Sequence, residues 1–257
     1  MPKLSFISDF DFDRALNHVT QAIDDALIYE QSVKAAIEND DIFSSRLFSN
    51  SIDPISMRIG MGLSSDVAWL SAEIKRQLYK TYEQKIGEFH QIILGSVDGW
   101  MDLGVGDDQK VDLCKEDETV YIELKNKFNT CNSDALLSVE NKLLKLLDKK
   151  PLATAYWAFI VPTTKLRQGN TLWYKSGKKE KHPRLRKAWG AEVYRLVTGD
   201  NNALHEMYSE LENSLQKNRK SDNLDAIAER IIALLAGDIE KIKEEIFYRT
   251  VADNTPE

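Results

Sequence analysis

The chain is poor in the residues that cross-link proteins or bind transition metals. Its 257 residues include two cysteines, Cys114 and Cys131, which form no CxxC pair, and four scattered histidines, so no zinc-ligand spacing is present. No apolar run approaches the length of a membrane span, and the acidic N-terminus has no signal-peptide core. We therefore expect a soluble protein of the reducing cytoplasm, with no membrane partner.

Positive charge is scarce in most of the chain but concentrated in one segment. The net charge is −7, yet residues 165–187 ("KLRQGNTLWYKSGKKEKHPRLRK") hold nine Lys or Arg and one acid, a balance of +8 that leaves −15 for the remainder. Such a concentration indicates a polyanion site, and Arg interleaved with aromatic residues favours nucleic acid. The alternative is a solvated, lysine-rich loop. The predicted DNA contacts here are Lys175, Lys178, Lys179, Lys181, Arg184 and Arg186.

Hydrophobic periodicity predicts helices at both ends of the chain and strands in the middle. The expected helices cover residues 11–39, 65–95, 133–148, 203–216 and 224–251, and the expected strands are "KVDLC" (110–114), "TVYIELK" (119–125), "ATAYWAFIVP" (153–162) and "AEVYRLVTGD" (191–200). Ser64 or Ser65 is expected to cap the second helix. This order predicts one α/β (α+β) domain over 1–257, with a mixed β-sheet flanked by helices in a core at 65–215 and added helical regions at 1–64 and 216–257.

Three charged residues lie in or beside the two predicted central strands. Side chains alternate along a strand, so Glu123 and Lys125 share one face while Ile122 and Leu124 point to the other. If "KVDLC" pairs with "TVYIELK" as a hairpin, Asp112 lies beside Glu123. Two carboxylates and a lysine can hold Mg²⁺ and activate water for phosphodiester hydrolysis. The alternative is an edge strand whose charges prevent aggregation, and the residues alone leave both interpretations open.

Other polar residues are candidates with ordinary alternatives. Glu88 lies beside the apolar stripe of the long helix before these strands and could add a third acid to the site, or it could be a solvated helix residue. Lys127, Asn129 and Asn132 follow the second strand, where they could contact DNA or form a polar loop that caps the next helix. We expect His90, next to Phe89, to be a packed or hydrogen-bonded residue rather than a ligand. The segment "GVGDD" lacks the further glycines and the lysine of a P-loop.

Four segments taken in order resemble one family of nucleases. "KIGEFHQIILGSVDGW", "KVDLC", "YIELKNKFNTCNSD" and "YRLVTGDNNAL", within about residues 80–210, resemble type II restriction endonucleases that read GGNCC and belong to the PD-(D/E)xK superfamily. The most distinctive word is "ELKNKFNT". One departure is Val111, which stands where the superfamily name has Pro.

The resemblance implies a fold, a chemistry and a set of partners. It implies a PD-(D/E)xK nuclease core that cleaves double-stranded DNA with Mg²⁺ as a homodimer, with a cognate methyltransferase as genetic companion in a restriction-modification system. By motif position, Asp112 and Glu123 resemble the acids, Lys125 the lysine, and Glu88 the helical acid of some members. The predicted metal ligands are Asp112, Glu123 and Leu124. The alternatives are a PD-(D/E)xK repair or junction nuclease and a non-catalytic DNA-binding or helical assembly protein.

Overall fold

The computed structural model divides the chain into two compact units. The sheet unit comprises Met1–Val19 and Lys85–Asn218, and the helical unit comprises Thr20–Gln84 and Arg219–Glu257. These boundaries differ from the predicted subdivision at residues 64/65 and 215/216. The structure describes residues 2–23, 27–104, 111–163, 168–174, 182–218, 224–235 and 237–251.

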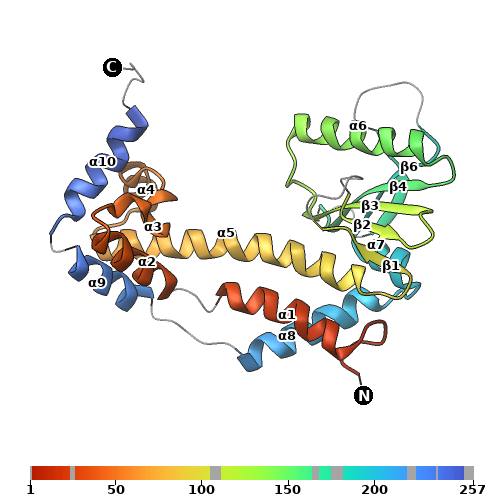
Figure 1. Ribbon diagram of the computed structural model, residues 1–257, viewed down its shortest axis with the longest axis horizontal. Coiled ribbons are helices and arrows are strands. Elements are labelled where there is room, and N and C mark those ends of the chain that lie inside the picture. Colours follow the sequence, from red (N-terminus) through yellow and green to blue (C-terminus); the bar gives the residue numbers. More distant parts are fainter. Residues whose placement is uncertain are drawn as a thin grey trace. The chain divides into compact units, whose positions relative to one another are not determined.

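A mixed β-sheet forms the centre of the sheet unit (Figure 1), which confirms the predicted α/β fold class. In the described part of the chain six strands run in the order β1-β2-β3-β4-β6-β5. Strands β3, β4 and β6 are parallel, and the pairs β1/β2, β2/β3 and β5/β6 are antiparallel. The strands are β1 (Trp100–Asp102), β2 (Leu113–Lys115), β3 (Val120–Lys127), β4 (Thr154–Val161), β5 (Gly169–Leu172) and β6 (Leu185–Trp189).

Helix α6 (Ser133–Lys149) covers one face of this sheet (Figure 1). Its apolar side chains share a core with Tyr121 of β3 and with Trp157 and Phe159 of β4. The register pairs Tyr121 with Ala155, Glu123 with Trp157 and Lys125 with Phe159. Because alternate strand residues share a face, Glu123 and Lys125 lie on the α6 face of the sheet.

On the other face, α7 (Ala191–Thr198) packs against β4, β5 and β6, and the C-terminal part of α5 (Asp66–Gly95) approaches β3 and β1. Helix α8 (Ala203–Asn218) packs on α7, and α1 (Asp9–Ile23) packs on α5. A Cβ placed on Gly87 would lie 3.8 Å from the Cβ of Asn126, so α5 approaches β3 on the face opposite to Glu123. Buried rings join the helices, including Phe12 with Phe89. His90 is fully buried and its Nδ1 lies 2.8 Å from the hydroxyl of Tyr194, which confirms its predicted role as a packed residue.

One predicted strand is wrong. The segment "AEVYRLVTGD" forms helix α7, which begins after Gly190 and ends before Gly199, a residue with a φ of 78°. Its buried residues are Val193, Tyr194 and Val197, a helical spacing that the β-prone composition of the segment obscured. The strand that follows β4 in the sheet is instead β6, which lies just upstream within the basic segment and runs parallel to β4.

The helical unit has a core of its own. Ser65 Oγ accepts a hydrogen bond from the Ala68 N–H, so Ser65 caps α5 as expected. The core residues come from α2, α3, α4, α5, α9 and α10 and include the fully buried Trp69. The other elements of this unit are α2 (Leu27–Glu38), η1 (Ile42–Ser44), α3 (Arg46–Ser49), α4 (Pro54–Met61), α9 (Leu224–Leu234) and α10 (Ile239–Val251).

Two of the expected long helices are divided. The expected helix over residues 224–251 consists of α9 and α10, and Gly237 between them has a φ of 96°, a conformation that no helix interior contains. The expected helix over 11–39 corresponds to α1 and α2. None of the helices in the described ranges has the length and apolar composition needed to cross a membrane.

Candidate active site

The β2–β3 hairpin brings together the three residues expected there. The N–H of Asp112, directly before β2, donates to the carbonyl of Ile122 at 3.1 Å, which places Asp112 beside Glu123. The Asp112 Oδ2 atom accepts a hydrogen bond from the Leu124 N–H at 2.6 Å. Lys125 Nζ lies 2.8 Å from Glu123 Oε1 and 3.7 Å from Asp112 Oδ2. The two carboxylates and the lysine therefore form one cluster where β2 begins.

Charge and burial in this cluster shift the protonation of its members. Glu123 is only 5% exposed. Burial, and next the Glu123 carboxylate, raise the pKa of Asp112 above its ordinary value, against the opposing effect of Lys125. Burial disfavours the charged form of Lys125, but the carboxylates of Asp112 and Glu123 outweigh it and raise the pKa of that ammonium. Lys125 is therefore a cation at neutral pH.

The oxygen atoms at this site suit a hard divalent cation. No group of three or more His, Cys, Asp or Glu side chains with metal-binding geometry occurs among the residues that the structure describes. Asp112 and Glu123 supply two carboxylates, and the carbonyl of Leu124 faces the same neighbouring strand as the Leu124 N–H that bonds Asp112. Mg²⁺ commonly takes one or two carboxylates and completes its shell with water and phosphate oxygens, so this donor set fits it.

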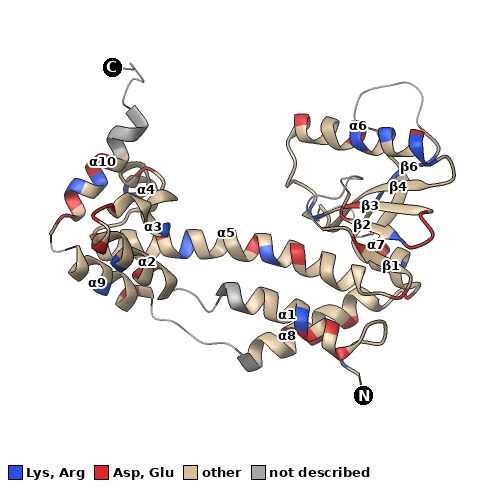
Figure 2. Ribbon diagram, viewed as in Figure 1, with Lys and Arg blue, Asp and Glu red and all other residues tan. Residues whose placement is uncertain are grey.

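A fourth charged residue, Lys142 of α6, completes the cluster and was not predicted. Its Nζ pairs with Glu123 Oε2, so both oxygens of Glu123 contact lysine ammonium groups. Lys142 follows the buried Val139 by three residues and precedes the buried Leu146 by four, at the edge of the stripe that faces the sheet. That spacing was the available sequence signal. Figure 2 shows α6 with several basic residues along its length.

Glu88 has a different environment from the hairpin residues. It pairs with His18 of α1, and its Oε2 atom lies 2.8 Å from Lys85 Nζ. The adjacent Gly87 approaches the sheet from the face opposite to Glu123. A catalytic role for Glu88 stays a prediction, and its hydrogen bond with His18 links α1 to α5.

The predicted DNA-contacting residues divide into three groups. Lys127 ends β3 and shares the face of Glu123 and Lys125, and Asn129 is exposed in the following turn. Asn132 caps α6 by accepting a hydrogen bond from the Ala135 N–H at 2.8 Å. The remaining lysines, Lys175, Lys178, Lys179 and Lys181, lie outside the described residues.

The two arginines predicted to contact DNA bond to the protein itself. Arg184 Nη1 donates to the carbonyls of Lys150 at 2.9 Å and Ala153 at 2.7 Å, and Nη2 donates to the Leu147 carbonyl at 3.2 Å. These carbonyls lie at and just beyond the C-terminal end of α6. Arg186 Nε donates to Asn170 Oδ1 at 2.7 Å, on the sheet face away from Glu123. The geometry favours structural roles for both guanidinium groups.

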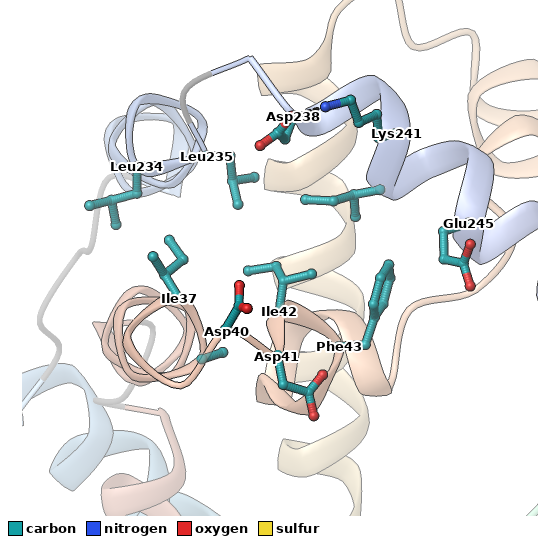
Figure 3. Close-up of a pocket in the computed structure, with 12 residues that line it drawn as sticks. Ile37, Asp40, Asp41, Ile42, Phe43, Leu234, Leu235, Asp238, Lys241 and Glu245 are labelled. Atoms are coloured by element: carbon teal, nitrogen blue, oxygen red, sulfur yellow. Dashed lines mark hydrogen bonds and ion pairs between the residues drawn. The ribbon is translucent and has the colours of Figure 1, made fainter.

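The helical unit contains a cavity of about 570 Å³ whose lining differs from the charged cluster of the hairpin (Figure 3). Apolar residues such as Ile37, Ile42 and Leu235 line it together with the acids Asp40 and Asp41. The lysine in its lining lies 2.7 Å from an aspartate oxygen. A polyanion such as DNA would meet repulsion there, so the candidate active site is the charged cluster of the sheet unit rather than this cavity.

Comparison with known proteins points to one family. Residues 4–218 match the family described as Eco47II restriction endonuclease. The chain is 32% identical over 216 residues to "Type II restriction enzyme Sau96I" of Staphylococcus aureus, covering 79% of this chain and 76% of that protein. It is also 32% identical over 226 residues to "Type II restriction enzyme Eco47II" of Escherichia coli, covering 84% of this chain and 88% of that protein.

Proposed function

The chain belongs to the Eco47II restriction endonuclease family and is a type II restriction endonuclease, and from this premise we propose that it hydrolyses double-stranded DNA at GGNCC-like sites with Mg²⁺. The observation that carries the proposal is the cluster of Asp112, Glu123 and Lys125 on the β2–β3 hairpin. The target sequence rests on the family resemblance of "ELKNKFNT" and its neighbouring segments.

In the proposed mechanism Asp112, Glu123 and the Leu124 carbonyl would hold the metal ion. Bound Mg²⁺ would lower the pKa of a coordinated water and polarise the scissile phosphate. The Asp112 carboxylate is held toward β3 by the Leu124 N–H at 2.6 Å, so its position is fixed before substrate arrives. In the metal-free protein Glu123 is oriented by its two lysine partners.

Lys125 would serve this reaction as a cation. In the metal-free protein the two neighbouring carboxylates raise the pKa of Lys125, which favours its ammonium form. An ammonium can donate hydrogen bonds that orient the attacking water and can offset charge that develops on the phosphate.

We propose a homodimer for reasons of symmetry. A GGNCC site is a palindrome around one free base pair, and each chain supplies one set of Asp112, Glu123 and Lys125, so paired cuts call for two chains on a two-fold axis. A methyltransferase that protects the same cytosines is the expected genetic companion. The cytoplasm is the proposed place of action, and the unpaired thiols of Cys114 and Cys131 fit its reducing conditions.

The test is a digest of fully sequenced DNA with the fragment ends read. Mg²⁺ should give discrete fragments with ends inside GGNCC or the narrower GGWCC. Glu123→Gln and Lys125→Met should each reduce cleavage by at least about a thousandfold. Both variants should still bind DNA in Ca²⁺, a poorer Lewis acid that accepts looser geometry. Matched controls are Glu118→Gln and Lys115→Met, which remove the same charges from the other end of the hairpin.

Each alternative function gives a different result. A random smear would indicate a repair or junction nuclease of the same superfamily. DNA binding with no cleavage at any Mg²⁺ concentration would indicate a non-catalytic DNA-binding or assembly protein. Cleavage rates within tenfold of wild type in both site variants would refute the site assignment. Sedimentation of the protein as a monomer under conditions of paired cutting would refute the dimer.

A further inference from the structure

The Glu123 carboxylate is held between two lysines from different elements. Lys125, two residues along β3, lies 2.8 Å from Oε1, and Lys142 of α6 pairs with Oε2. Glu123 itself is 5% exposed, so little water reaches its oxygens. A divalent cation that takes Glu123 as a ligand therefore has to replace at least one ammonium contact.

Charge in the cluster is balanced without a metal ion. Asp112 and Glu123 contribute two negative charges, and Lys125 and Lys142 contribute two positive charges. A buried carboxylate without a counterion would be costly, so the two lysines stabilise the metal-free protein. When a divalent cation binds, the same lysines become like-charged neighbours of that cation and oppose its binding.

We propose that Lys142 is a built-in counter-cation that holds Glu123 in place in the metal-free protein and is displaced from it when a divalent cation binds. This inference rests on the proposed function, in which Asp112 and Glu123 hold the metal. Lys125 belongs to the strand motif of the hairpin, whereas Lys142 reaches the site from α6 and nothing in that motif calls for it. Lys142 is thus a positioning residue that sets how strongly the site binds metal.

The location of Lys142 makes it suited to this exchange. Lys142 lies between the buried residues Val139 and Leu146 along α6, and its side chain is only 26% exposed and reaches Glu123 Oε2. The alternative is that the ion pair mainly orients Glu123 for the metal ion. The two interpretations predict opposite changes in metal affinity when the Lys142 charge is removed, because loss of an orienting contact would weaken metal binding, whereas loss of a competing cation would strengthen it.

The first experiment measures Mn²⁺ affinity by electron paramagnetic resonance of the free ion, since Mn²⁺ accepts the same oxygen ligands as Mg²⁺. Lys142→Met keeps the apolar stem and removes the charge. We expect it to bind Mn²⁺ about tenfold more tightly than wild type, a modest value for charges within a few ångströms of each other. Lys145→Met removes the same charge from an exposed position on α6 and should stay within about twofold of wild type. Lys142→Arg should restore the wild-type affinity.

The second experiment needs no variant. Saturating wild-type protein with Mn²⁺ should release the Lys142 ammonium and increase its acetylation by an amine-reactive reagent, read by mass spectrometry, while Lys145 stays unchanged. Unaltered Lys142 labelling, or Mn²⁺ affinity in Lys142→Met equal to or weaker than wild type, would overturn the inference. Glu123→Gln tests whether Glu123 holds the metal ion at all. If it binds Mn²⁺ as well as wild type does, the proposed metal site fails and the inference fails with it.

Discussion

Arg184 offers a sharp test of how the basic segment is used. Its guanidinium donates three hydrogen bonds, at 2.7, 2.9 and 3.2 Å, to carbonyls at the end of α6. Helix C-terminal carbonyls lack intrahelical partners and carry partial negative charge, so a forked cation there stabilises the fold. Each bond to a charged donor contributes about 1.5–3 kcal/mol when buried. Arg184 is partly exposed and water can replace some of these contacts, so we expect Arg184→Met to lower the free energy of unfolding by about 2–3 kcal/mol in total.

The assay combines stability with DNA binding. For a chain of this size the loss corresponds to a melting temperature lower by about 4–12 °C. Arg184→Lys should recover little, because a single ammonium cannot span three carbonyls. Arg186→Met removes one side-chain hydrogen bond, to Asn170, and should cost about 1 kcal/mol. Below its melting temperature, Arg184→Met should bind duplex DNA in Ca²⁺ with wild-type affinity and salt dependence. Full stability with weakened, less salt-dependent binding would refute the structural role and restore the predicted DNA contact.

Two further predictions concern the buried His90 of α5 and the N-terminal cap of α6. Burial lowers the pKa of His90 from 6.5 to about 3, so below about pH 6.5 the unfolded chain takes up a proton that the folded protein excludes. The free energy of unfolding should fall by up to about 1.4 kcal/mol per pH unit as the pH drops from 6.5 toward 3. Urea titrations at several pH values measure this change, and in His90→Gln the free energy of unfolding should depend less on pH. Asn132→Ala should cost about 1 kcal/mol by loss of the α6 cap, measured by thermal unfolding, and should leave cleavage intact; a large loss of DNA affinity would instead indicate a direct contact.

The clustering of Asp112, Glu123 and Lys125 on the β2–β3 hairpin was predictable because it depends on local structure alone. Strand alternation puts Glu123 and Lys125 on one face, and a short turn brings Asp112 beside them, so no knowledge of distant packing is needed. Lys142 was not predictable in the same way. Its partner lies 19 residues away on another element, and only the parallel crossover from β3 through α6 to β4 joins them. A stripe-edge lysine on an amphipathic helix is usually solvated, and sequence spacing does not reveal which one faces a buried acid.

The error at residues 191–200 has the same origin. Val193, Tyr194 and Val197 are β-prone residues, yet the glycines on both sides delimit a helix of eight residues whose buried side packs against the sheet. The neighbouring strand β6 carries Arg186 and Lys187 and so reads as a charged loop, although Leu185, Ala188 and Trp189 are buried. Tertiary packing overrides local propensity in both segments. Part of the basic segment therefore forms a strand of the sheet, which its charge density did not indicate.

The balance of two lysines and two carboxylates in one half-buried cluster should also affect when the site binds a metal ion. A site with unbalanced acids would bind a divalent cation tightly but would be unstable without one, because Asp112 and Glu123 would repel each other. A site balanced by lysines folds without metal and binds it more weakly. The phosphate oxygens of bound DNA would then supply the missing ligands and negative charge. Wild type should therefore bind the metal ion more tightly with duplex DNA than without it. In Lys142→Met the two affinities should be closer to each other, because the Lys142 charge that the phosphate offsets is gone. Equal DNA-dependence in the two proteins would show that Lys142 does not set this balance.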